Sequence, residues 1–135
     1  KLFKKHIPAA KVIGTEISHT ANQFENTIEH DFHNPIKEYI GKFDILYSNS
    51  LDHSYDPEKC IKTWIEQINT EGLLCIDLAQ GREMVSRELD PLEISTDELI
   101  NMLRYDFKLK YKLSKVIHRP RGINSQLIIF EKWED

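Results

Sequence analysis

Polar side chains that could bind or activate a ligand follow four apolar segments of the sequence. They are Glu16, Asp31, the polar run 48–56 and Asp77. A carboxylate in such a place can accept hydrogen bonds from the vicinal hydroxyls of a ribose or from an exocyclic amine. A histidine such as His53 can remove a proton at neutral pH. These residue types favour the binding of a small polar ligand, with proton transfer as a further possibility.

Each of these residues, taken alone, also has a purely structural interpretation. An acid after a strand often caps a helix or stays in a solvated loop. Asp56, which precedes Pro57, is predicted to be such a helix cap. His53 alone is more often a hydrogen-bonded loop residue than a catalyst. Cys60 and Cys75 lie on apolar segments and are predicted to be unreactive.

A metal site could in principle be built from His30, His33, His53 and Cys60. Their spacing matches no compact zinc signature, and two residues of the set lie in differently placed elements, so no metal is predicted. No Ser-His-Asp or Cys-His pair is assigned either, because such pairs depend on contacts in space.

The elements that must position these residues alternate between strands and helices. Strands are predicted at 11–17, 27–32, 43–48, 73–78, 108–117 and 126–131. Helices are predicted near 1–6, 18–24, 36–40, 57–68 and 95–103, with room for a short one within 79–91. This alternation predicts an α/β fold with three layers, in which helices cover both faces of a mostly parallel sheet. Ligands then bind at the carboxyl ends of the strands.

Local signals set the boundaries of these elements. The run 43–48 is apolar without alternation, which predicts a strand covered on both faces. Residues 69–72 predict a turn, and Ser95 with Glu98 has the spacing of a capping box. A short loop at 119–122 separates the last two strands, so they are predicted to form an antiparallel hairpin.

Length and composition limit the classes of protein that fit. The chain has 135 residues, enough for one domain at 1–135, and its 40% hydrophobic content is ordinary for a soluble globular protein. The net charge of −4 argues against a dedicated nucleic-acid-binding protein. No apolar run approaches the roughly 18 residues needed to span a bilayer. Two cysteines fit a reducing compartment, so a cytoplasmic location is expected.

Together, these segments resemble a class I S-adenosylmethionine-dependent methyltransferase of the small-molecule branch, which has a Rossmann-like fold. Residues 12–18 resemble the family's second strand, and residues 30–32 resemble the turn after its third strand. The densest match is 41–78, where an apolar strand, a Leu-x-His at 51–53 and an Asp-Pro at 56–57 follow one another.

The resemblance also implies roles for individual residues. Glu16 would hold the cofactor ribose, Asp31 would accept from the adenine amine, and Phe32 would line the base pocket. Ile17 and Ser48 would complete the cofactor site. The transfer site would be formed by Asn49, Asp52 and His53, with His53 as a possible general base.

One feature of this family is missing from the sequence. Only 5 glycines are present, and no two are close enough to form the glycine-rich loop that cradles the methionine part of the cofactor. In the family this loop follows the first strand, which would lie upstream of Lys1. We therefore expect an N-terminally truncated domain, either a fragment or a compact relative, that binds the cofactor weakly or not at all. A second copy of the chain could cover an exposed strand edge.

The sequence therefore favours methyl transfer to a small-molecule acceptor in the intact protein, with no membrane partner and with nucleic acid an unlikely one. The alternative is a non-catalytic scaffold or dimerisation module with the same fold. A nicotinamide-dependent dehydrogenase ranks last, because it needs a glycine fingerprint that is also absent. The methyl acceptor cannot be predicted from the sequence.

Overall fold

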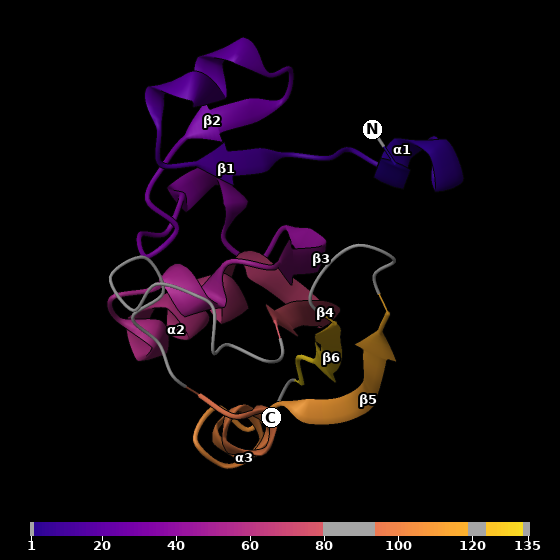
Figure 1. The fold of residues 1–135 in the computed structure, drawn as a ribbon. Helices are drawn as coiled ribbons and strands as arrows, with labels where there is room; N and C mark the ends of the chain where they lie inside the picture. The colour runs from indigo at the N-terminus through magenta and orange to yellow at the C-terminus, as the bar shows by residue number, and fades with distance from the viewer. Residues whose placement is uncertain (1, 80–93, 119–123, 134–135) are drawn as a thin grey trace. The chain divides into compact units, whose positions relative to one another are not determined.

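In the computed structural model, the described residues are 2–79, 94–118 and 124–133. They belong to two units, Lys1–Asn34 and Pro35–Asp135. Figure 1 labels their helices and strands. The assignment of residues 1–135 to one domain stays a prediction.

The first unit contains a short parallel strand pair. Its elements are α1 (Leu2–His6), β1 (Gly14–Glu16), the 3-10 helix η1 (His19–Gln23) and β2 (Thr27–Glu29). Gly14 pairs with Thr27, and Glu16 pairs with Glu29. The strands predicted at 11–17 and 27–32 are therefore present but shorter than predicted. The second starts after Asn26, which has a left-handed φ of 57°, and ends before a turn closed by a hydrogen bond from the Asn34 N–H to the Asp31 carbonyl.

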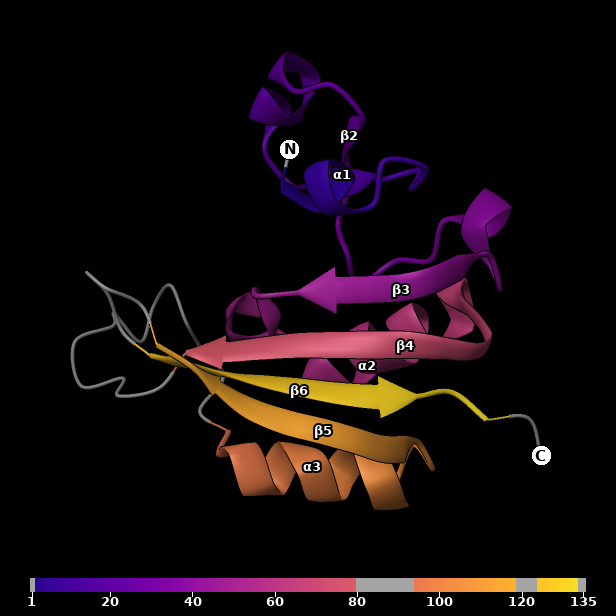
Figure 2. The same cartoon turned by 90° about the vertical axis from the view of Figure 1, so that its right-hand side faces the viewer.

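The second unit is built on a four-stranded sheet with the strand order β3-β4-β6-β5 (Figure 2). Its elements are η2 (Lys37–Tyr39), β3 (Phe43–Ser48), η3 (Leu51–His53), α2 (Pro57–Gln67), β4 (Ile68–Ala79), α3 (Thr96–Tyr105), β5 (Lys110–Ile117) and β6 (Ser125–Glu131). β3 and β4 are parallel, whereas β4 with β6 and β5 with β6 are antiparallel. The predicted C-terminal hairpin is confirmed, and the sheet is mixed.

The apolar core of the second unit lies on one side of this sheet. Leu74, Ile76, Ile128 and Phe130 are all at most 1% exposed. Paired residues of neighbouring strands point to the same side, and Leu74 pairs with Phe130 as Ile76 pairs with Ile128. Figure 1 shows α2 and α3 on one side of the sheet.

The other side of β3 differs from the prediction. Ile45 and Tyr47 are 40% and 53% exposed, so the prediction that this strand is covered on both faces is wrong for the side that carries them. The continuous apolar run at 43–48 reflects a strand with one buried side and one accessible apolar side. The helix layer on that second side stays a prediction.

The helix α2 begins at the residue that its sequence predicts. The N–H of Lys59 donates to the Asp56 carboxylate at 3.1 Å, and Pro57 occupies the first turn, which confirms the predicted cap. Cys60, Ile61 and Trp64 form the buried stripe.

The prediction of a turn at 69–72 is wrong, because β4 continues through these residues. β4 begins at Ile68, which pairs with Phe43, and the strand continues through these residues. Glu71 has a left-handed φ of 64°, and the register with β3 shifts between Phe43 and Ile45. The turn-forming residues therefore produce an irregularity inside a long strand rather than a separate loop.

The capping box predicted at the start of α3 is confirmed. The Glu98 N–H donates to Ser95 Oγ at 3.2 Å, and the Ser95 N–H donates to Glu98 Oε2 at 2.8 Å. The hydrogen bond from the Ser95 backbone N–H, and next a hydrogen bond from the Ser95 side chain, hold the pKa of the Glu98 carboxyl below its ordinary value. The helix then buries Leu99 and Leu103.

We expect Ser95→Ala to lower the free energy of unfolding by about 1 kcal/mol at pH 7, because the Glu98 N–H loses its cap. The pKa of Glu98 is lowered in the folded state, so its contribution is complete above the ordinary pKa of about 4.3. That contribution is lost as the pH falls through the folded-state pKa. Urea denaturation at pH 7 and in acid measures both effects, and equal stability of the two proteins at pH 7 would contradict the prediction.

Two predicted elements, the short helix within 79–91 and the turn at 119–122, lie outside the described residues. Among the helices that the structure describes, none has the length and apolar character needed to cross a membrane.

Candidate functional site

Glu16 ends β1, where the fold places ligands. Its Oε1 accepts a hydrogen bond from the Ser18 N–H at 3.1 Å, which orients the carboxylate beside the start of η1. A carboxylate has about four acceptor positions, so Glu16 can also accept from a ligand hydroxyl. Glu16 is exposed, and the next residue, Ile17, is 67% exposed. This strand end therefore presents one acceptor group and one apolar surface to a ligand.

Asp31 follows β2 and is held by the histidine two residues further on. Its Oδ1 lies 2.6 Å from His33 Nδ1 and 3.0 Å from the backbone N of His33. The His33 ring is only 1% exposed, whereas the Asp31 side chain is 27% exposed. The Phe32 and His33 rings meet edge to face, with centroids 4.7 Å apart. The carboxylate of Asp31 is thus fixed in orientation while it remains accessible.

The second unit places Ser48 and Asn49 at the carboxyl end of β3. Ser48 is 8% exposed, and its Oγ accepts from the Ser50 N–H at 3.1 Å. Asn49 is exposed, and its Oδ1 accepts from the Ser50 hydroxyl at 3.1 Å. Leu51, which follows, is fully buried and fixes the loop to the core.

Asp52 and His53 lie together in η3. Their side chains are 13% and 56% exposed, and His53 Nε2 is 3.7 Å from Asp52 Oδ1. That distance is too long for a hydrogen bond.

One polar pair at this end of the sheet was missed by sequence reasoning. The Tyr47 hydroxyl donates to Asp77 Oδ2 at 3.0 Å, and Asp77 is 8% exposed. Tyr47 pairs with Cys75, so Asp77 lies two residues further along the neighbouring strand on the same side. The sequence marked Asp77 as a polar residue near a strand end, but its pairing depends on the register between β3 and β4.

The predicted site residues thus form two groups, one in each unit. The first group is Glu16, Ile17, Asp31 and Phe32; the second is Ser48, Asn49, Asp52 and His53. His30, one of the residues considered for a metal, instead has its Nε2 2.7 Å from the Asn34 carbonyl oxygen. Within residues 2–79, 94–118 and 124–133, no three His, Cys, Asp or Glu side chains are placed to hold a metal ion.

These residues fit the adenosine part of S-adenosylmethionine. Glu16 and Asp31 supply accessible carboxylates, which suit ribose hydroxyls and an adenine amine. The 5 glycines stand at positions 14, 41, 72, 81 and 122, too far apart for a glycine-rich loop. The chain therefore has accessible carboxylates after β1 and β2 and no closely spaced glycines that could form such a loop.

Solved structures share this fold. A 1,6-didemethyltoxoflavin-N1-methyltransferase from Burkholderia thailandensis, solved with S-adenosylhomocysteine, matches with a TM-score of 0.69 at 13% identity, over 89% of this chain and 60% of its own. A structure described for the conversion of a disulfide bond into a thioacetal group during echinomycin biosynthesis matches with a TM-score of 0.70 at 14% identity, over 98% and 71%. The DszA carbon methyltransferase matches with a TM-score of 0.64 at 10% identity, over 96% and 42%.

These matches define the class of fold. The chain has the fold of S-adenosylmethionine-dependent methyltransferases, as the resemblance of its motifs predicted. It spans 60% of the length of the Burkholderia enzyme. No model of a protein family and no curated protein sequence matches the chain. At 10–14% identity the matches establish the fold alone.

Proposed function

We propose that the full-length protein transfers a methyl group from S-adenosylmethionine to a small-molecule acceptor. The observation that carries this proposal is the pair of carboxylates, Glu16 and Asp31, after two parallel strands of a methyltransferase fold. Both carboxylates have a fixed orientation, through Ser18 and His33 respectively, and neither is buried.

In this proposal the first unit holds the nucleoside part of the cofactor. Glu16 accepts hydrogen bonds from the ribose hydroxyls, and Asp31 accepts from the adenine amine. Phe32 offers a ring against the base, and Ile17 offers an apolar surface beside Glu16. Ser48, in the second unit, is proposed as a further contact of the cofactor. When bound, S-adenosylmethionine supplies a methyl group on a positively charged sulfur.

Asn49, Asp52 and His53 face the acceptor in this proposal. Methyl transfer depends chiefly on holding the acceptor in line with the methyl group, so few side chains need to react. The Asn49 amide can orient the acceptor through hydrogen bonds. His53 can remove a proton from an acceptor that must lose one, and the Asp52 carboxylate lies beside it, 3.7 Å from His53 Nε2.

We expect Glu16→Gln to weaken binding of S-adenosylhomocysteine about tenfold, because a charged hydrogen-bond acceptor for the ribose is lost. Isothermal titration calorimetry on the full-length gene product measures this change. Glu25→Gln is the matched control, since Glu25 is an exposed acid of the same unit outside the predicted site, and it should leave the affinity unchanged. Absence of any binding by the unmodified protein would refute the proposal.

The alternative of a non-catalytic dimerisation module makes the opposite prediction. The exposed apolar side of the sheet, with Ile45, Tyr47 and Leu113, is the observation that favours it. It requires no binding of S-adenosylhomocysteine and a dimer that dissociates when Tyr47 is replaced by lysine. Sedimentation analysis beside the calorimetry separates the two functions.

A further inference from the structure

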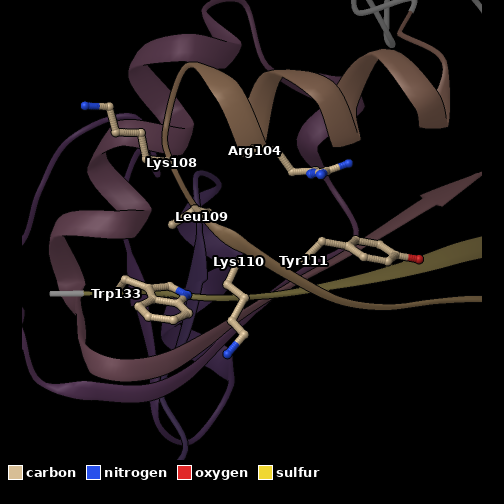
Figure 3. A pocket seen from close by; sticks show the side chains of 6 residues that line it. All are labelled: Arg104, Lys108, Leu109, Lys110, Tyr111 and Trp133. Carbon is tan, nitrogen blue, oxygen red and sulfur yellow. The ribbon is translucent and has the colours of Figure 1, made fainter. Parts of the chain in front are cut away.

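Charged side chains surround a pocket of about 520 Å³ at the end of α3, but they do not converge (Figure 3). Arg104 and Lys108 point apart in this view. Lys110 and Tyr111 are adjacent on β5, so their side chains point to opposite faces of the sheet. In the first unit, by contrast, a buried histidine contacts two of the residues that are proposed to hold the cofactor.

This histidine, His33, makes two hydrogen bonds to one oxygen of Asp31. Its Nδ1 lies 2.6 Å from Asp31 Oδ1, and its backbone N–H donates to the same oxygen at 3.0 Å. A carboxylate oxygen only accepts hydrogen bonds, so Nδ1 carries the hydrogen. The His33 ring is 1% exposed and has little room for another rotamer. The two donors therefore set the rotation of the Asp31 carboxyl group.

The backbone of this loop is held by hydrogen bonds that do not involve the His33 ring. The His30 N–H donates to the Glu16 carbonyl at 2.9 Å, and the Asn34 N–H donates to the Asp31 carbonyl at 3.0 Å. His30 Nε2 also lies 2.7 Å from the Asn34 carbonyl oxygen. A change at the His33 ring should therefore alter the orientation of the Asp31 carboxylate more than the position of the loop.

The His33 ring also packs against Phe32. The two rings meet edge to face, with centroids 4.7 Å apart and planes at 86°. In the proposed function, Asp31 and Phe32 both contact the adenine base. One buried side chain thus contacts both the hydrogen-bonding group and the apolar surface of the proposed base site.

We propose that His33 is a positioning residue through which the base site selects a purine with an exocyclic amine. The inference rests on the proposed function, in which Asp31 binds the base. With Oδ1 turned toward His33, the carboxylate offers further acceptor positions to the ligand. The 6-amino group of adenine can donate to them, whereas the 6-oxo group of hypoxanthine brings an oxygen against an oxygen. A site built for a donor rejects the analogue that lacks it.

The test compares S-adenosylhomocysteine with S-inosylhomocysteine, which carries oxygen in place of the amine, by isothermal titration calorimetry on the full-length gene product. The unmodified protein should bind the adenosine compound at least about tenfold more tightly. In His33→Gln the amide lies one carbon beyond the place of Nδ1, so this preference should fall to about threefold or less. In His33→Asn the amide nitrogen can take the place of Nδ1, and the preference should stay within about twofold of the original.

Asp31→Asn tests the same orientation at an accessible side chain, so it remains informative if His33→Gln does not fold. With His33 donating to the amide oxygen, the amide nitrogen should face the base and donate to a 6-oxo group. We therefore expect this variant to bind S-inosylhomocysteine about threefold more tightly than S-adenosylhomocysteine. The double variant with His33→Gln should bind the two compounds within about twofold of each other.

His19→Gln is the matched control. It replaces another histidine of the same unit, whose side chain is 93% exposed, and it should change neither affinity. A merely structural role of His33 predicts that His33→Gln weakens the binding of both compounds by the same factor. That result, equal binding of both compounds by the unmodified protein, or no reversal in Asp31→Asn would overturn the inference. Absence of binding of both compounds by the unmodified protein would instead refute the proposed function itself.

Discussion

Replacing Gly72 by alanine is expected to lower the free energy of unfolding by about 3 kcal/mol. A Cβ atom at this position of β4 would clash with Ile68 Cγ2 and lie 2.9 Å from the backbone oxygen of Asn69. Ile68 is 1% exposed, so its side chain has no room to move aside. The Gly72 carbonyl also accepts from the Lys132 N–H at 2.9 Å, which fixes the strand on its other side. The start of β4 would therefore have to shift.

Gly41→Ala is the matched control for this prediction. Gly41 has a φ of 65°, but a Cβ atom there would meet nothing within 4 Å. Its replacement should cost only about 1 kcal/mol, the penalty of a left-handed alanine. Urea denaturation of both variants measures the difference. A cost for Gly72→Ala no larger than that for Gly41→Ala would show that the contact with Ile68 can relax.

The helices could be predicted because their signals are local. Asp56 before Pro57, and Ser95 three residues before Glu98, place the beginnings of α2 and α3, and the structure shows both caps. A cap depends only on residues within one turn, so the sequence contains all that determines it. The pairing of the last two strands as a hairpin also follows from the short distance between them along the chain.

The irregular part of β4 could not be predicted, because its conformation depends on residues that are distant in the sequence. Residues 69–72 have the composition of a turn, yet the strand continues through them because Ile68 finds a partner in Phe43. That pairing joins residues 25 positions apart, with a register shift before Ile45. The accessibility of Tyr47 depends in the same way on what the fold places beside it. Such non-local contacts override local preference.

The candidate site, like the fold, has some features that the local sequence predicts and others that depend on contacts in space. Glu16 and Asp31 could be selected as acids that follow strands, and the structure places them after β1 and β2. The hydrogen bond that orients Asp31 through His33 depends on a side-chain conformation. The pair of Tyr47 and Asp77 depends on strand register. The sequence could therefore indicate the candidate side chains but not the contacts that hold them.

Leu51→Ala is expected to lower the free energy of unfolding by about 3 kcal/mol, because a fully buried leucine leaves a cavity when it is truncated. Leu51 lies between Asn49 and Asp52 in the loop after β3, and η3, which contains it, contacts β4. The loss should therefore also loosen the loop that carries the predicted transfer residues. Urea denaturation measures the first effect, and amide hydrogen exchange at His53 and Ser54 measures the second.

Leu113→Ala distinguishes anchoring of the loop from a general loss of apolar surface. Leu113 is 48% exposed on β5, so its truncation should cost only about 0.5 kcal/mol and leave exchange at His53 unchanged. In Leu51→Ala the amides of His53 and Ser54, which donate to the carbonyls of Ser50 and Leu51, should exchange faster than the fall in global stability explains. If these amides exchange more slowly, or only as fast as global unfolding predicts, Leu51 stabilises the fold without positioning Asp52 and His53, and the order of the predicted transfer residues must come from elsewhere in the loop.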